Sequence, residues 1–222
     1  MSHLKRQQSP KNWPIERKGT AYLVRPNYNG ENGVPVLIAV RDMLKLAKNR
    51  KEVKHAMNSK QVTLNHRPIF SDKDTVQLFD VITIIPAKDS KHGEKNYKLV
   101  MGKNKKFGLQ EISIAQAGHK LAKIINKKTL RGNKTQINLS DGRNFLSDIK
   151  CSVNDSALVN LKSKRLEKCL PMKQGERVIV YAGKHAGEEG KIIAVEKENN
   201  RVKLEIENES VDILIKQIMV LE

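Results

Sequence analysis

An excess of positive charge limits how this chain can fold more than any other feature. Of its 222 residues, 42 are Lys or Arg and 24 are Asp or Glu, so the formal net charge is +18. Like charges repel one another within a compact fold, and a bound polyanion relieves that repulsion. Since only 38% of the residues are hydrophobic, several small cores are favoured over one large core. The composition therefore predicts small modules that bind nucleic acid or an anionic membrane face.

The positive charge is not spread evenly along the chain. Residues 1–70 carry 14 basic and 4 acidic side chains, and residues 71–171 carry 20 and 10. Residues 172–222 carry 8 basic and 10 acidic side chains, so the last quarter is slightly acidic. We therefore expect the anion-binding surface within the first three quarters of the chain.

Nothing in the sequence indicates a membrane or secreted protein. The longest apolar run, residues 34–40, contains Pro35 and is far shorter than the ~20 residues that span a bilayer. The N-terminus lacks the apolar stretch of a signal peptide. Cys151 and Cys169 form no CxxC pair, so no zinc site is expected and a reducing cytoplasm is the natural compartment. Two cysteines are enough for one disulfide, so a bond between them stays possible by number alone.

Residues 1–36 are predicted to form a basic arm that becomes ordered on RNA, although a solvated tail is the alternative. Proline and glycine interrupt helices there, and residues 22–25 are apolar enough for a short strand. Trp13 either stacks on an exposed base or anchors the arm to its own protein, and both roles stay open. The other candidate RNA-binding residues of the arm are His3, Lys5, Arg6, Arg17, Lys18 and Arg25.

Residues 37–85 have the pattern of helix, turn, helix, strand, turn and strand. Apolar residues recur at helical spacing from residue 36 to 46, and a second helix begins near Asn49. Asn49 is a good N-cap, and Glu52 lies three residues on, as in a capping box. Strands are expected at residues 61–65 and 79–85, with a turn between them at residues 66–68.

Cations gather around the second helix. Lys51 and Lys54 are three residues apart and share a face, while the helix N-terminus attracts phosphate through its free N–H groups and its dipole. An ordinary charged face exposed to solvent is the alternative, but the net charge of +18 favours a face that binds RNA. The candidate residues of this module are Arg41, Lys45, Lys48, Asn49, Arg50, Lys51, Lys54 and Arg67.

The remaining chain reads as mostly β-structure. In residues 86–171 short alternating segments surround an Asp141-Gly142 hairpin signal, and only residues 115–125 are compatible with a helix. Residues 172–222 predict a small all-β barrel with a glycine-rich loop at residues 183–190. Lys184 and His185 in that loop are candidate RNA contacts, and a plain hairpin tip is the alternative.

Two segments resemble a known RNA-binding module. The run Asn49-Arg-Lys-Glu-Val-Lys54, followed by Val62-Thr-Leu-Asn65, resembles the "S-four" module. Asn49 replaces the usual serine, and Lys60 and His66 stand where glycine is usual. Ribosomal proteins, pseudouridine synthases and RNA methyltransferases all use this module, so it implies RNA binding without choosing among them.

Further resemblances narrow the family. The segment His3-x-Lys5-Arg6 with Pro10-x-x-Trp13-x-Ile15-x-Arg17-Lys18 resembles the opening of the ribosomal "S-four-e" family of archaea and eukaryotes, with Gln7 as a departure. Ile137-Asn-Leu-Ser-Asp-Gly-Arg-Asn resembles that family's central β-domain. Residues 175–192 resemble a KOW motif with Gly187 at its characteristic glycine. These features follow the order of the family over nearly the whole chain.

The resemblance implies a multi-domain α+β fold. Its expected parts are the arm (1–36), a small α/β S-four-like module (37–85), a mostly-β central domain (86–171) and a KOW-type small β-barrel domain (172–222). The implied function is a structural constituent of the small ribosomal subunit, with rRNA and neighbouring ribosomal proteins as partners in the cytoplasmic ribosome. No membrane, small-molecule substrate, cofactor or metal is expected.

Catalysis is not expected from the residues present. Six histidines are scattered without an HExxH pair, and neither a phosphate-binding GxxxxGK[ST] loop nor a cofactor glycine fingerprint occurs. An S-four-module rRNA-modifying enzyme, of the pseudouridine synthase or methyltransferase type, is the alternative. A KOW-type transcription or translation factor that binds and leaves is a third hypothesis.

Overall fold

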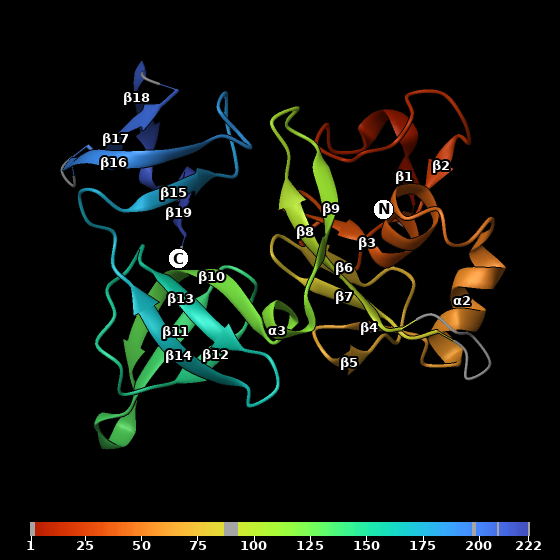
Figure 1. Ribbon diagram of the computed structural model, residues 1–222, viewed down its shortest axis with the longest axis horizontal. Helices are drawn as coiled ribbons and strands as arrows, with labels where there is room; N and C mark the ends of the chain where they lie inside the picture. Colours follow the sequence, from red (N-terminus) through yellow and green to blue (C-terminus); the bar gives the residue numbers. More distant parts are fainter. Residues whose placement is uncertain (1–2, 87–92, 197–198, 208, 222) are drawn as a thin grey trace. The chain divides into compact units, whose positions relative to one another are not determined.

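The computed structural model describes residues 3–86, 93–196, 199–207 and 209–221 (Figure 1). The chain divides into two compact units. Unit 1 comprises Met1–Met101 and Lys106–Gly118, and unit 2 comprises Gly102–Lys105 and His119–Glu222. The finer four-part division expected from the sequence stays a prediction.

Unit 1 is built around a five-stranded antiparallel sheet, in which β7 joins the module to the β8–β9 hairpin. Two shorter strand pairs, β1–β2 and β3–β6, hold the arm and the start of the first helix. The strands of the large sheet, in spatial order, are β5 (Arg67–Pro68), β4 (Val62–Leu64), β7 (Val81–Ile84), β8 (Lys95–Met101) and β9 (Phe107–Ile112). The short pairs are β1 (Leu4–Lys5) with β2 (Tyr22–Leu23), and β3 (Gly33–Pro35) with β6 (Thr75–Gln77). A one-turn 3-10 helix, η1 (Arg6–Gln8), follows β1.

The first predicted helix is shorter than its sequence pattern suggests. It consists of α1 (Val36–Ile38) and a π-helical turn, η2 (Ala39–Met43), in which the Leu44 N–H donates to the carbonyl of Ala39 at 3.0 Å. Val36 to Val40 are all at most 3% exposed. The segment therefore serves as a buried core element, and its polar face is confined to the last turn.

The second predicted helix is confirmed as α2 (Arg50–Asn58). The side chain of Asn49 accepts a hydrogen bond from the Glu52 N–H at 3.0 Å, and Glu52 accepts one from the Lys48 N–H at 2.7 Å. These bonds satisfy N–H groups at the helix start, as a capping box does. Val53 and Met57 face the core, so the opposite face of α2 is left to solvent.

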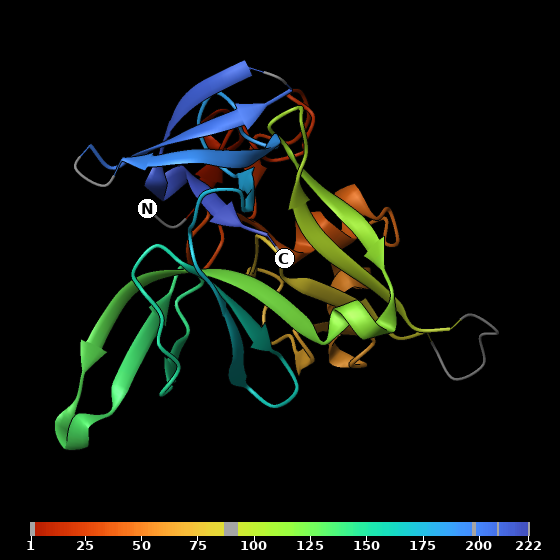
Figure 2. The ribbon, with the colours of Figure 1, turned by 60° about the vertical axis from the view of Figure 1, so that its left-hand side comes forward.

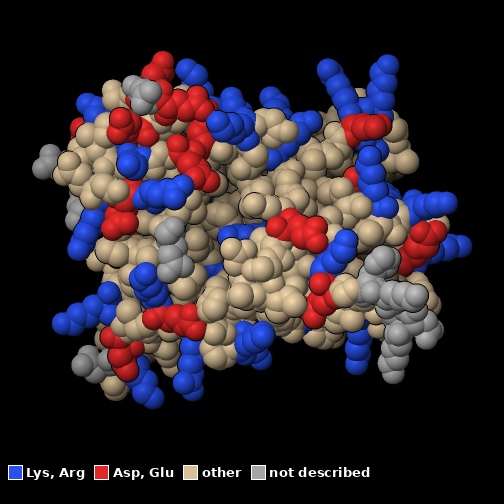
Figure 3. All heavy atoms as spheres, in the orientation of Figure 1, with Lys and Arg blue, Asp and Glu red and all other residues tan. Residues whose placement is uncertain are grey.

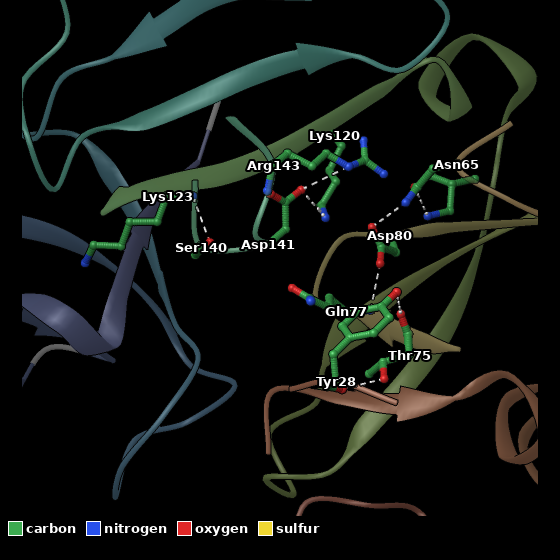
Figure 4. Close-up of polar contacts among 11 residues, drawn as sticks. Tyr28, Asn65, Thr75, Gln77, Asp80, Lys120, Lys123, Ser140, Asp141 and Arg143 are labelled. Carbon is green, nitrogen blue, oxygen red and sulfur yellow. Dashed lines mark hydrogen bonds and ion pairs between the residues drawn. The ribbon is translucent and has the colours of Figure 1, made fainter. Parts of the chain in front are cut away.

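A buried polar network fixes the turn between β4 and β5. Asn65 and His66 both have positive φ, 51° and 58°, as a tight two-residue hairpin requires. The Asn65 amide donates to Asp80 at 2.6 Å and accepts from the Val81 N–H at 3.0 Å (Figure 4). Asp80 also accepts from the Gln77 N–H at 2.7 Å, so this acid is a buried turn residue.

Unit 2 begins with a five-stranded antiparallel sheet. Its longest strand, β10, covers residues where the sequence suggested a helix at 115–125. Only α3 (Ile114–Ala117) is helical there, because β10 pairs with β13 on one side and β11 on the other. In spatial order the strands are β12 (Asn144–Leu146), β11 (Thr135–Leu139), β10 (His119–Thr129), β13 (Ser156–Asn160) and β14 (Arg165–Leu170). The Asp141-Gly142 hairpin is confirmed, with Gly142 at a φ of 81°.

The last segment forms a second five-stranded antiparallel sheet in unit 2. In spatial order its strands are β18 (Glu209–Leu214), β17 (Arg201–Ile206), β16 (Glu189–Glu196), β15 (Arg177–Val180) and β19 (Ile218–Val220), with a 3-10 turn, η4 (Ile215–Gln217), before β19. Burial alternates along β17, so one face packs into a core and the other meets solvent. The predicted α+β fold class, with a mostly-β chain and a C-terminal KOW unit, is confirmed.

Candidate nucleic-acid interface

The solvent face of α2 carries exposed cations on a rigid frame. Lys51 and Lys54 project from the helix, and Lys48 precedes it. None of the three forms an ion pair within the described part of the chain. Figure 3 shows Lys and Arg side chains projecting around α2, whereas carboxylates gather over the C-terminal sheet. The charge split expected from the sequence is therefore visible on the surface.

Arg50 differs from the neighbouring lysines because its side chain helps to hold α2 in place. Its guanidinium binds both carboxylate oxygens of Asp72, with Nη2 to Oδ1 at 3.2 Å and a second, shorter contact from Nε. The Asp72 side chain is only 4% exposed. This ion pair joins the N-terminus of α2 to the loop before β6. The hydrogen bond that Arg50 donates to Asp72 raises the pKa of Arg50 above its ordinary value.

Two predicted contacts of the first helix do not join the α2 face as expected. Lys45 follows the π-turn with a φ of 55°, so it is not four residues along a helix from Arg41. Arg41 forms a two-point ion pair with its neighbour Asp42, at 2.9 and 2.8 Å. Because the helix ends at Met43, Arg41 and Lys45 do not share a helical face, although their spacing of four residues had indicated one.

The structure corrects the base-stacking hypothesis for Trp13. Its side chain is 1% exposed, and its indole N–H donates to the carbonyls of Gly30 at 3.1 Å and Gly33 at 2.9 Å. Trp13 therefore anchors the arm and cannot stack on RNA without leaving the core. Arg6 also holds the arm, because its guanidinium donates to the carbonyls of Glu16 and Thr20.

Four predicted residues meet at one cavity in unit 1. His3 and Arg25 of the arm, Arg41 of the first helix and Arg50 of α2 all line a space of about 370 Å³. Lys73 and Tyr22, which the sequence reasoning did not select, complete the charged and aromatic part of its wall. No local signal links these residues, because they come from four separate segments.

The sequence reasoning also missed a basic hairpin in unit 2. Figure 2 shows the far end of β10 and the start of β11 as a projecting two-stranded hairpin, closed by η3 (Arg131–Asn133). Lys128, Arg131 and Lys134 are exposed there and form no ion pair within the described residues. A cluster of Lys and Arg at residues 127–134 was the available signal.

The remaining predicted contacts lie on the surface, apart from one that binds its own loop. The His185 Nδ1 atom is 2.8 Å from Glu188 in the glycine-rich loop between β15 and β16. Gly183 and Gly187 in that loop have positive φ, 94° and 91°, which favours glycine. The other exposed predicted cations are Lys5, Arg17, Lys18, Arg67 and Lys184.

Two lysines of β10 are buried and serve the fold of unit 2. The Lys120 Nζ atom is 2.9 Å from the Asp141 carboxylate, and Arg143 lies 3.6 Å from the same group (Figure 4). Burial raises the pKa of Asp141, but Lys120 and the bonds from Arg143 outweigh it, and the pKa lies below its ordinary value. Lys123 donates to the carbonyls of Ile215 and, at 2.9 Å, Ile218, while burial lowers its pKa to about 8.

Other classes of site find no support in the described residues. Within residues 3–86, 93–196, 199–207 and 209–221, no three His, Cys, Asp or Glu side chains lie close enough to hold a metal ion. None of the helices in those ranges has the length and apolar character to cross a membrane.

Comparison with known sequences identifies the family. The sequence model of ribosomal family S4e matches residues 93–166, an RS4NT domain model matches residues 2–28, and the KOW motif matches residues 174–205. The small ribosomal subunit protein eS4 of Methanothermobacter thermautotrophicus is 36% identical over 193 residues, which cover 86% of this chain and 77% of that protein. This chain belongs to ribosomal family S4e.

Another S4e relative and a solved S4e structure also match most of the chain. The eS4 protein of Nanoarchaeum equitans is 31% identical and covers 93% of this chain and 89% of its own length. The crystal structure of 30S ribosomal protein S4e from Thermoplasma acidophilum matches the fold with a TM-score of 0.72, at 24% identity, over 86% of this chain and 95% of that one. The family resemblance drawn from the N-terminal, central and KOW segments is thereby confirmed.

Proposed function

We propose that this S4e protein is a structural constituent of the small subunit of the cytoplasmic ribosome, where it binds rRNA beside neighbouring ribosomal proteins. The relatives are named small ribosomal subunit proteins, which does not favour the rRNA-modifying enzyme. The observation that carries the RNA-binding part is the α2 face. Lys51 and Lys54 project from a capped helix that an ion pair with a buried acid holds in place, and Lys48 precedes it. None of these three lysines has an ion-pair partner among the residues that the structure describes.

Phosphate recognition explains why these lysines stand on a rigid element. Each phosphate that they neutralise releases counterions, so affinity depends strongly on salt. Contacts of this kind fix position and register and read little sequence. The projecting hairpin with Lys128, Arg131 and Lys134 offers a second contact of the same chemistry.

The test replaces Lys48, Lys51 and Lys54 by alanine in the full chain and measures affinity for small-subunit rRNA across a range of salt. The slope of log affinity against log salt should become shallower by up to about three units. Arg50 stays intact, because its removal would leave the buried Asp72 carboxylate without its partner. An unchanged slope would show that this face meets solvent.

A matched control comes from the acidic C-terminal sheet. Lys191 and Lys203 lie on β16 and β17, Lys173 precedes β15, and all three are exposed. Replacing these three lysines by alanine removes the same formal charge and should alter the slope far less. Sedimentation of a native lysate addresses the ribosomal part separately. The protein should remain with the small subunit in moderate salt, and its release as free protein would instead favour a factor that binds and leaves.

A further inference from the structure

The cavity of unit 1 has the size of a site for one small ligand. It measures about 370 Å³, near the lower end of the roughly 300–1,000 Å³ typical of small-molecule pockets. Its wall is built from the arm, from the first helix, from the start of α2 and from the loop before β6. A single nucleotide fits such a space, whereas an RNA duplex does not.

The charge of the wall favours an anion. Arg25, Arg41, Arg50 and Lys73 line the cavity, and no Asp or Glu is among its lining residues. Asp42 and Asp72 engage Arg41 and Arg50 from outside the wall. Arg25 and Lys73 are exposed and have no ion-pair partner within the described chain. Two cations are thus available to a phosphate, which Arg and Lys bind by charge-assisted hydrogen bonds.

The rest of the wall suits a base. Leu37 and Ile38 are 2% and 1% exposed, so they form a fixed apolar floor. Tyr22 is 56% exposed and meets the His3 ring edge-on, with ring centroids 4.9 Å apart. Unpaired RNA bases stack on exposed aromatic rings of this kind. A bare phosphate would leave both the floor and the ring unused.

Hydrogen bonds tie the parts of the wall together before any ligand arrives. Asp72 holds Arg50 through its carboxylate, and its carbonyl accepts from the Leu37 N–H at 3.1 Å. The Lys73 carbonyl accepts from the Asn27 N–H of the arm at 3.0 Å. A site that is already formed loses less free energy in ordering when its ligand binds.

From these observations we infer that the cavity receives one unpaired nucleotide of rRNA, with its phosphate on Arg25 and Lys73 and its base against Tyr22 and the Leu37–Ile38 floor. This inference rests on the proposed rRNA binding and adds a specific site to it. Extruding a paired base from a duplex costs free energy, so the site selects nucleotides that are already unpaired.

The first experiment follows backbone amide resonances of the full chain during titration with adenosine monophosphate. Amides of Tyr22, Arg25 and Ile38 should shift, and the double variant R25A/K73A should lose the response. The matched control K95A removes an exposed lysine of β8 and should keep it. If no shift appears at these positions, or the double variant responds like the wild type, the inference is wrong.

Two further measurements distinguish recognition of the phosphate from recognition of the base, and RNA from a free nucleotide as the ligand. Inorganic phosphate that reproduced the same shifts at the same concentration would reduce the site to an anion site and overturn the role of the base. The variant Y22F should retain affinity for the nucleotide, and Y22L should lose it. A short single-stranded oligoadenylate should displace the mononucleotide; if the mononucleotide stays bound under saturating oligoadenylate, the occupant is a free nucleotide and the inference fails.

The outcome is distinguishable from that of the proposed function. If the α2 lysine variants change the salt slope but the cavity takes no nucleotide, only the inference falls. The opposite result is also possible: the cavity binds the nucleotide, RNA displaces it, and the α2 variants leave the salt slope unchanged. That result would support the nucleotide site and contradict the α2 interface.

Discussion

The ammonium of Lys120 lies 2.9 Å from the carboxylate of Asp141, and their side chains are 2% and 5% exposed. Lys120 is on β10 and Asp141 is in the turn between β11 and β12, so the pair joins two neighbouring parts of one sheet. Burying either charge alone is costly, and the pairing offsets that cost. Removing one partner should therefore be more harmful than removing both.

The variant D141N tests this pair. It should lower the free energy of unfolding by about 3 kcal/mol, because the Lys120 ammonium loses its carboxylate in a dry environment. Urea denaturation of the full chain measures the change. The folded pKa of Asp141 lies below its ordinary value of 3.8. The stabilisation of the fold by the ionised Asp141 is therefore present above about pH 4, and it is lost as the pH falls through the folded pKa.

Two controls make the result specific to the buried pair. D148N neutralises an exposed aspartate two residues after the end of β12, and should change the free energy of unfolding by less than about 0.5 kcal/mol. The double variant K120M/D141L should recover much of the loss. A D141N protein as stable as the wild type would contradict the assignment.

The lowered pKa of Lys123 should make the free energy of unfolding depend on pH in the alkaline range. Its pKa is about 8 in the folded chain and 10.5 ordinarily. Between these values the unfolded chain binds more protons, so this residue makes the free energy of unfolding rise with pH, by up to about 1.4 kcal/mol per unit. Below about pH 8 the lysine is protonated in both states, and its contribution to the slope vanishes.

The measurement compares the wild type with K123M by denaturant unfolding between about pH 7 and pH 11. Other lysines and tyrosines titrate in both proteins, so the difference between the two curves reports Lys123. The variant also loses the hydrogen bonds to Ile215 and Ile218, which lowers its stability without imposing a pH dependence. Parallel curves would show that Lys123 has an ordinary pKa.

Trp13 should behave as an anchor of the arm. W13F removes both hydrogen bonds from the indole N–H and should cost about 1–3 kcal/mol of stability. Because Trp13 is the one tryptophan of the chain, its fluorescence reports this site directly. Its emission should stay that of a buried indole when RNA is added, and a shift or quenching typical of stacking would restore the base-stacking hypothesis.

The projecting hairpin should contribute to RNA binding independently of α2. Replacing Lys128, Arg131 and Lys134 by alanine should make the salt slope shallower by up to about three units without loss of stability. Lys127 is left intact because its Nζ atom donates to the Cys151 carbonyl at 3.2 Å. A slope equal to that of the wild type would assign the hairpin to another partner.

The two predicted helices show where local sequence suffices. Asn49 and Glu52 form the cap of α2 from residues three apart, so the sequence alone locates that helix and its solvent-facing lysines. The same reasoning failed at residues 115–125, where β10 pairs with β11 and β13. Strand pairing supplies hydrogen bonds from residues distant in the chain, and it overrides a weak helical pattern.

The charge excess, its concentration in the first three quarters and the family follow from the sequence, because each depends on residue identity and order alone. Which cations are available to RNA was decided by the tertiary structure. Arg50 is held by Asp72, and Lys120 is paired with Asp141. Lys123 is bound by the carbonyls of Ile215 and Ile218, and Trp13 is buried against Gly30 and Gly33. The cavity that collects Arg25, Arg50 and Lys73 exists only once distant segments pack together. Contacts between distant residues depend on three-dimensional packing, and no local pattern in the chain encodes them.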